Sequence, residues 1–228
     1  MLGNSGSPIP HPVGLYAHLS PPEWHNVCAA GVPVHYQPRA VLLRQGESTE
    51  HVHIIVAGCV KATRSESDGS QALLTLRAAG DVVGDLSAVD RRPRSATVTA
   101  LTDVITHLLS GEQFRRFLTL PSVAAGFAAY TVGRLREADR QRTEMAVLSV
   151  RQRLARTLLR LDRAGGHTPG PIRLPQWELA ELVGASRNAV VAELASLRDQ
   201  GIVVTRRRQI DVVDSERLTV VAAEPATD

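Results

Sequence analysis

The chain has 228 residues, of which 43% are hydrophobic and 21% charged, so it is long enough for one large domain or two modest domains with real cores. Its uninterrupted runs of apolar residues and glycine, such as residues 54–60, are far short of the roughly 20 residues of a membrane-spanning helix. The two cysteines, Cys28 and Cys59, lack the CxxC spacing of zinc or cysteine-ligated iron–sulfur sites. The N-terminal residues lack the basic end and apolar core of a signal peptide, so we expect a cytoplasmic protein without a membrane partner.

The formal net charge is only +3, but the basic residues are concentrated in one segment. Residues 148–209 contain 11 Lys and Arg against 5 Asp and Glu, whereas the rest of the chain contains 15 against 18. Such a local excess is expected where a segment faces DNA. A solvated basic surface without a partner would have the same composition.

In chain order, residues 1–20 are predicted to form a flexible arm and residues 21–120 a compact β-roll. Short apolar runs such as AVLL, HVHIIVAG and ALLTL follow one another in the second segment. Many short strands with glycine punctuation are typical of a barrel or roll. The glycines that separate these runs are Gly46, Gly58, Gly69, Gly80 and Gly84.

Pro121 opens a long stretch with few helix breakers, and we predict one helix over residues 121–147. The steps of three and four that link Leu135, Ala138, Arg142 and Met145 resemble a short coiled-coil seam, so this helix is expected to pair two copies of the chain. The alternative is a single amphipathic helix that packs on its own domain. A second helix is expected over residues 150–163 and ends at the breaker-rich loop GGHTPGP.

The segment PQWELAELVGASRNAVVAELASLRDQGIV, residues 175–203, has the most specific local pattern in the chain. A helix over residues 176–183 should end at Gly184, where a tight turn needs a positive φ angle. Ser186 should cap the next helix, which we expect over residues 187–200. Two short helices around a glycine-bearing turn form a helix-turn-helix, whose second helix fits the DNA major groove.

After Gly201, the segment IVVTRRRQIDVVD predicts a two-stranded wing with three arginines at its tip, placed to meet phosphate oxygens. On the recognition helix, Arg187 suits guanine and Asn188 suits adenine, while the small Ala192 allows close approach. Residues 148–228 are therefore predicted to be a winged helix-turn-helix domain that binds double-stranded DNA. The arginines of the wing are Arg206, Arg207 and Arg208.

The stretch GDLSAVDRRPRSATV, residues 84–98, places a carboxylate after a glycine and an arginine–serine pair nine and ten positions later. A guanidinium matches the charge and geometry of a phosphate, and backbone amides at a helix start also favour an anion. A small-molecule phosphate site is one interpretation, and an ordinary charged surface turn is the other.

Together these stretches strongly resemble the CRP/FNR family of bacterial transcription regulators over residues 34–213. LLRQGESTEHVHIIVAGCVKA resembles the β-roll core of the family, GDLSAVDRRPRSATV its phosphate-binding cassette, and ELAELVGASRNAVVAEL its helix-turn-helix. The resemblance implies an α+β fold with an N-terminal, jelly-roll-like cyclic nucleotide-binding β-roll, a long central dimerisation helix and a C-terminal winged helix-turn-helix domain. It further implies a homodimer that binds a palindromic operator, under the control of an effector in the roll.

The resemblance also assigns roles to residues of the cassette. Asp85 takes the place of the acidic residue that accepts a hydrogen bond from the ribose 2′-OH, and Arg94 that of the arginine that pairs with the cyclic phosphate. Ser95 and the backbone amides of the cassette complete the cradle. The ligand-binding residues expected in the roll are Gly84, Asp85, Leu86, Ser87, Arg94 and Ser95.

This sequence departs from the cAMP sensors of the family at several positions. Asp85 is one methylene shorter than their usual glutamate, and Ala138 and Asp139 stand where a Thr–Ser pair contacts the adenine amino group. Gln176 replaces a phosphate-contacting arginine. We predict no obligatory cofactor and cAMP as the first candidate effector, with cGMP, a cyclic dinucleotide or no effector as alternatives.

The family resemblance also allows for RNA polymerase as a partner. Some relatives bind haem in the same roll, for which His35, His51, His53 and His107 are the candidates, although no third ligand follows at a fixed spacing. The sequence contains no P-loop, metal motif or nucleophile–base pair, so we expect no catalysis.

Overall fold

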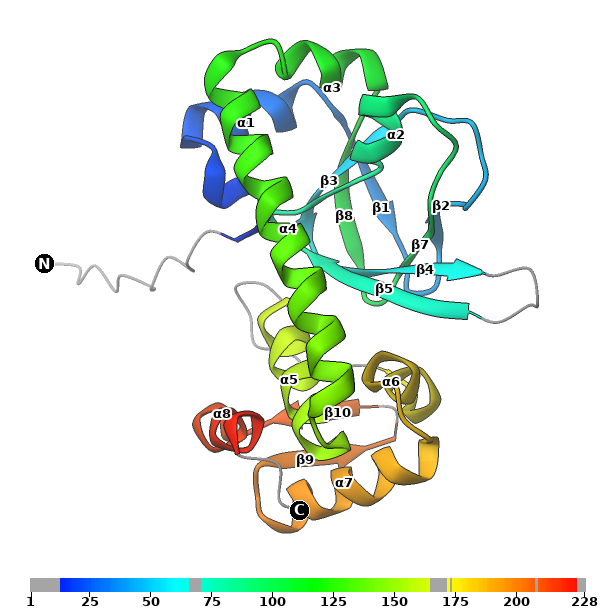
Figure 1. Cartoon of the computed structure of the whole chain (residues 1–228), viewed down its shortest axis with the longest axis vertical. Coiled ribbons are helices and arrows are strands. Elements are labelled where there is room, and N and C mark those ends of the chain that lie inside the picture. The colour runs from blue at the N-terminus through cyan, green and yellow to red at the C-terminus, as the bar shows by residue number, and fades with distance from the viewer. Residues whose placement is uncertain (1–12, 66–70, 165–171, 173, 208, 225–228) are drawn as a thin grey trace, which may run out of the picture.

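The computed structural model describes residues 13–65, 71–164, 172, 174–207 and 209–224. Figure 1 shows a β-rich domain at one end, a small helical domain at the other, and one long helix that runs alongside the first and reaches the second. Within the described residues, no helix is long and apolar enough to cross a membrane.

The β-rich domain is the predicted roll, built from two four-stranded antiparallel sheets. Strand β3, inside the first sheet, is buried along most of its length, and its buried residues are His53 as well as Val52, Ile54 and Ile55. In sheet order the strands are β1 (Val32–Tyr36), β8 (Val104–Leu109), β3 (Val52–Ala57) and β6 (Val82–Val83), then β2 (Val41–Leu43), β7 (Thr97–Ala100), β4 (Cys59–Ser65) and β5 (Gln71–Ala78).

Helical segments cover one end of the roll. The prediction of a flexible arm up to residue 20 is wrong for its last residues. A short 3₁₀ helix, η1 (Gly14–His18), buries Leu15 at 2% exposure, so the chain is packed well before residue 20. A helix of five residues with one buried leucine is too short to show a periodic signal, and its packing on the roll is a tertiary feature. The other helices of the roll are α1 (Pro21–Ala29), α2 (Asp85–Asp90) and α3 (Gly111–Phe117).

The long helix α4 (Pro121–Val147) has the predicted bounds, with Pro121 in its first turn, where the missing N–H is not needed. Its N-terminal half packs on the roll through Val123, Gly126 and Tyr130. Farther along, Val132 and Leu135 are 49% and 62% exposed. One face of α4 therefore belongs to the roll, and the opposite face is open.

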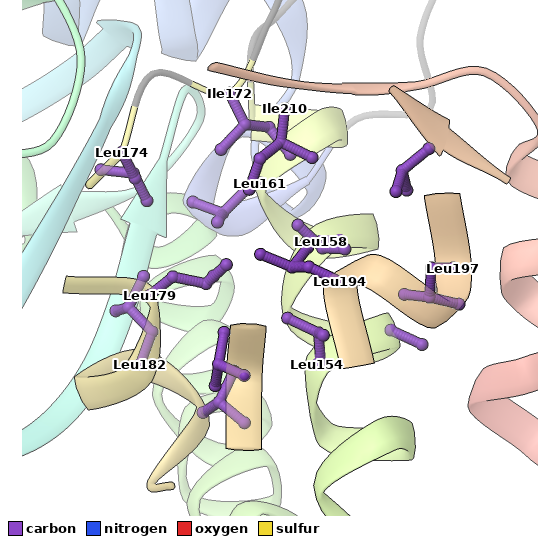
Figure 2. Close-up of a cluster of buried hydrophobic side chains, with 14 of the residues drawn as sticks. Leu154, Leu158, Leu161, Ile172, Leu174, Leu179, Leu182, Leu194, Leu197 and Ile210 are labelled. Carbon is purple, nitrogen blue, oxygen red and sulfur yellow. The ribbon is translucent and has the colours of Figure 1, made fainter. Parts of the chain in front are cut away.

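The C-terminal domain contains the predicted helix-turn-helix and wing. Its helices α5 (Val150–Ala164), α6 (Gln176–Val183) and α7 (Arg187–Asp199) pack with the wing strands β9 (Val203–Arg206) and β10 (Gln209–Val212). A further helix, α8 (Ser215–Ala223), was not predicted and packs on α5. Figure 2 shows the shared core, in which Leu158 of α5 lies close to Leu194 of α7 and Leu161 of α5 lies beside Ile172 and Ile210.

The two domains are packed against each other. The buried residues Cys59 and Leu101 of the roll belong to the same apolar cluster as the core of the C-terminal domain. Partly buried residues of β5, including Leu73 and Leu76, pack on that cluster as well. The strands β4 and β5 thus form the face of the roll on which the helix-turn-helix domain rests.

Candidate functional sites

The cassette starts with a backbone turn that only glycine fits well. Gly84 has φ +85° and caps α2, whose first residue is Asp85. A Cβ at this position would lie 2.7 Å from the carbonyl oxygen of His51 and 2.8 Å from Nη1 of Arg94. The glycine is therefore needed both for its dihedral angle and for the close approach of Arg94.

Arg94 is only 3% exposed, and the protein itself fixes its guanidinium. Nε donates to Oγ1 of Thr49 at 3.0 Å, Nη1 to the carbonyl of Gly84 at 2.9 Å, and Nη2 to the carbonyl of His51 at 2.6 Å. Burial lowers the pKa of Arg94, and the carboxylates of Glu47, Asp85 and Glu50 oppose that shift. An arginine has five N–H donors, so this anchoring leaves donors for an anion while it sets the orientation of the side chain.

Asp85 is paired with a residue that sequence reasoning did not identify. Its carboxylate lies 2.6 Å from Nη1 of Arg134 on α4, and the Asp85 side chain is 3% exposed. The Arg134 guanidinium also lies 5.3 Å from the centre of the Tyr130 ring. Burial disfavours the charge on Arg134, but Asp85, Tyr130 and Asp81 together outweigh it and raise its pKa. The sequence feature that could have identified Arg134 is its position one helical turn before Ala138, a residue that the family resemblance places at the ligand.

The structure brings most of the predicted ligand residues to one cavity of about 340 Å³ between the cassette, β5 and α4. Polar side chains of α4 that were not predicted, Thr131, Glu137 and Gln141, line it too. Asp139 is not part of this cavity: it is exposed and lies 3.1 Å from Arg142 on its own helix. The predicted residues in the lining are Gly84, Asp85, Leu86, Ser87, Arg94, Ser95 and Ala138.

The histidines considered as haem or metal ligands lie in different settings. His53 is 1% exposed, and its Nδ1 is 3.1 Å from Oγ1 of Thr106. Burial, together with the charges of His51 and Arg94, lowers the pKa of His53 to about 3. His35 lies 3.5 Å from Asp103 and is half-exposed. Over the described part of the chain, no three His, Cys, Asp or Glu side chains come close enough to hold a metal ion.

The turn of the helix-turn-helix is built as its sequence predicts. Gly184 ends α6 with φ +64°, and Oγ of Ser186 accepts a hydrogen bond from the backbone N–H of Ala189 at 3.2 Å. This cap starts α7 and leaves Arg187, Asn188 and Ala192 exposed on it. The residues expected to read base edges are therefore available on one surface.

A second hollow of about 350 Å³ lies between α6, the start of α7 and the wing. The predicted residues Gln176, Arg187, Arg206 and Arg207 line it together. Arg206 lies 2.9 Å from Asp211 across the hairpin, so its charge is partly neutralised. Arg208 lies outside the described residues. Sequence reasoning missed Trp177, which is half-exposed in the same lining.

Comparisons with known proteins identify the two domains in which these sites lie. The family model of the cyclic nucleotide-binding domain matches residues 33–119, and that of the Crp-like helix-turn-helix domain matches residues 152–221. A "CRP-like cAMP-activated global transcriptional regulator" of Mycobacterium tuberculosis is 31% identical over 82% of this chain and 86% of its own. The "Cyclic AMP receptor protein" of Thermus thermophilus is 30% identical over 84% of this chain and 85% of its own.

Solved structures share the fold. FixK2 from Bradyrhizobium japonicum superposes with a TM-score of 0.70 at 25% identity, and covers 86% of this chain and 99% of its own. The c-di-GMP responsive regulator CLP of Xanthomonas campestris superposes with a TM-score of 0.66 at 22% identity, over 85% of this chain and 99% of its own, which supports the fold alone.

Proposed function

The chain belongs to the CRP/FNR family of transcription regulators, and we propose that it is a homodimer whose affinity for a palindromic operator is controlled by a cyclic nucleotide in the roll. The observation that carries the proposal is the cavity in which Arg94 and the Asp85–Arg134 pair meet. We take cAMP as the first ligand to test because relatives about 30% identical are named for it.

In this proposal Arg94 holds the cyclic phosphate, with Ser95 and the start of α2 beside it. The anchored guanidinium presents its remaining N–H groups in a fixed direction, which favours a planar, bidentate contact with phosphate oxygens. The cation Arg134 lines the same cavity and adds to its attraction for an anion.

The sugar and base would meet groups that differ from those of the cAMP sensors described above. The side chain of Asp85 is shorter than that of glutamate, but it is paired with Arg134. The carboxylate of Asp85 can accept a hydrogen bond from a ribose hydroxyl, and the guanidinium of Arg134 can donate one at the same place. Ala138 can offer the base no hydrogen bond, whereas Gln141 lies one turn farther on and lines the same cavity. An amide both donates and accepts, so Gln141 suits the polar edge of a purine.

The exposed face of α4 supplies the proposed dimer contact. Val132, Leu135, Asp139 and Arg142 follow one another at steps of three, four and three, as in a coiled-coil seam, and all four are exposed. The seam expected from the sequence shares Leu135 and Arg142 with this face and also included Met145, which is 48% exposed, whereas its fourth residue, Ala138, is partly buried. The proposed seam therefore has the exposed Asp139 in place of Ala138 and contains the Asp139–Arg142 pair.

For DNA binding we propose that the first turn of α7 enters the major groove, with Arg187 and Asn188 at base edges. Gln176 and the wing arginines Arg206 and Arg207 would meet phosphates. RNA polymerase is a further proposed partner, which activation of transcription would require. The proposed role consists of binding and conformational coupling, without a catalytic step.

Titration calorimetry with cAMP, cGMP and cyclic dinucleotides tests the effector, combined with DNA selection from a random library to define the operator. We expect one ligand to bind and to increase operator affinity, because an effector acts through its differential affinity for two conformations. If no ligand gives heat while DNA still binds tightly, the protein works without an effector and the sensor role is wrong.

A further inference from the structure

Lys61 on β4 is the only lysine in a chain with 26 basic residues, all the others being arginine. Its Nζ lies 2.8 Å from Oε1 of Glu178 and 3.5 Å from Oε2 of Glu181, both on α6. The same Nζ is 5.8 Å from the centre of the Trp177 ring. One ammonium group of the roll therefore lies close to three side chains of α6, the first helix of the helix-turn-helix.

This contact is buried and has little freedom. The side chains of Lys61 and Glu178 are 12% and 6% exposed, and the apolar cluster that contains Cys59 and Leu101 lies at the same domain boundary. A buried carboxylate without its cation is strongly unfavourable. Helix α6 can therefore rest on the roll only where the ammonium reaches Glu178, and this fixes the position of the helix more tightly than apolar packing would.

Strand β4 also connects this contact with the ligand cavity. Successive side chains of a strand point to opposite faces, and Ala62, the neighbour of Lys61, lines the ligand cavity. Thr75, which pairs with Ala62 in the neighbouring strand, lines that cavity as well. A ligand that shifts this wall of the cavity must also shift the backbone that carries Lys61.

Helix α6 is the element through which such a shift would reach DNA. It carries Gln176 at its start, and Gly184 links its end to the cap of α7. Because α6 and α7 share one core, a displacement of α6 moves the recognition helix with it.

We propose that Lys61 is a positioning residue for DNA binding: its ion pair with Glu178 holds the helix-turn-helix domain on the roll and couples operator affinity to the occupancy of the ligand cavity. The coupling rests on the proposed function, whereas the holding contact does not depend on any ligand.

The holding contact can be measured directly, because Lys61 is the single side-chain amine of the chain. We expect acetylation of Lys61 by N-hydroxysuccinimidyl acetate, followed by mass spectrometry, to be on the order of tenfold or more slower in the native protein than in urea. Glu178→Gln should accelerate it severalfold in the native protein. Glu181→Gln is the matched control on the same helix, and should change the rate little because Glu181 is mostly exposed and more distant.

The coupling is measured as the ratio of operator affinities with and without a saturating effector. Lys61→Met should bring this ratio close to one while calorimetry shows unchanged ligand affinity, a separation that general destabilisation would not produce. Adding Glu178→Gln to Lys61→Met should cause no further loss, because both variants remove the same contact.

The outcomes separate the two proposals. Fast acetylation of native Lys61, or equal effects of Glu178→Gln and Glu181→Gln, would show that the ion pair does not hold the domains. A wild-type ratio in Lys61→Met would overturn the coupling. If no cyclic nucleotide binds while Lys61 stays protected, the effector proposal fails and the holding contact stands.

Discussion

The carboxylate of Asp85 lies 2.6 Å from the guanidinium of Arg134, and this pair joins the first turn of α2 to the middle of α4. Asp85 belongs to the cassette and Arg134 to the helix that we propose as the dimer contact. A ligand that competes for either group therefore acts on the connection between the roll and the central helix, so the pair is the first contact to test.

Replacement of Arg134 by Met should leave Asp85 as an unpaired buried carboxylate. We expect a loss of stability of about 3 kcal/mol, the lower end of the range for breaking a buried pair, together with weaker binding of the cyclic nucleotide. Urea unfolding and calorimetry measure the two effects. Arg136→Met, at an exposed position of the same helix, should change both very little; equal effects of the two variants would contradict the assigned role of the pair.

Gly84→Ala should disturb Arg94 directly. The added Cβ would clash with Arg94 and with the carbonyl of His51, and alanine is strained at φ +85°. We expect lower stability and a loss of cyclic nucleotide binding. Gly133→Ala is the matched control, because the helical Gly133 has open space around it and alanine favours the helix by about 1 kcal/mol. Ligand affinity that survives in Gly84→Ala would argue against Arg94 as the residue that binds the phosphate.

The buried His53 predicts a stability that depends on pH. Its folded pKa of about 3 lies below the ordinary value of 6.5, so the unfolded chain binds a proton that the folded chain does not as pH falls below 6.5. The contribution of neutral His53 to the free energy of unfolding is present in full above pH 6.5. As the pH falls from 6.5 to 3, the free energy of unfolding should decrease by up to about 1.4 kcal/mol per pH unit. The pKa of His51 is also lowered, chiefly by burial, and acts in the same direction.

Urea unfolding at several pH values, compared between the wild type and His53→Phe, isolates this contribution. The variant should lose stability less steeply as pH falls. Parallel pH profiles for the two proteins would mean that His53 takes up its proton in the folded state as well.

Arg187→Ala should abolish specific operator binding while the protein stays dimeric, because the first turn of α7 reads the bases. Arg207→Ala should instead weaken binding to all sequences and reduce the slope of log affinity against log salt by about one. Fluorescence anisotropy with the selected operator and a scrambled sequence distinguishes the two effects. Unchanged operator preference in Arg187→Ala would remove the assignment of the recognition helix.

Leu135→Glu should dissociate the proposed dimer, because it places a charge in the apolar part of the α4 seam. Sedimentation velocity gives the oligomeric state. Val220→Glu on α8 is a matched control, since Val220 is as exposed as Leu135 but lies outside the seam. A dimer that survives in Leu135→Glu would place the contact on another face.

Local features of the sequence determined much of this structure. The bounds of α4, α6 and the start of α7 follow from Pro121, Gly184 and the cap Ser186, because each imposes a backbone dihedral or a hydrogen bond on its immediate neighbours. The cassette glycine and its following carboxylate were likewise evident, as was the basic segment that contains the helix-turn-helix.

Only the tertiary structure decided which distant residues meet. Arg134 opposite Asp85, the carbonyls that anchor Arg94, and Lys61 against Glu178 all join elements far apart in the chain. The same holds for the rotation of α4, which turns Ala138 inward and Leu135 outward. Periodicity shows that a helix has an apolar face, but the packing of that helix on the roll determines which residues remain exposed, and this depends on shape and charge contributed by the whole chain.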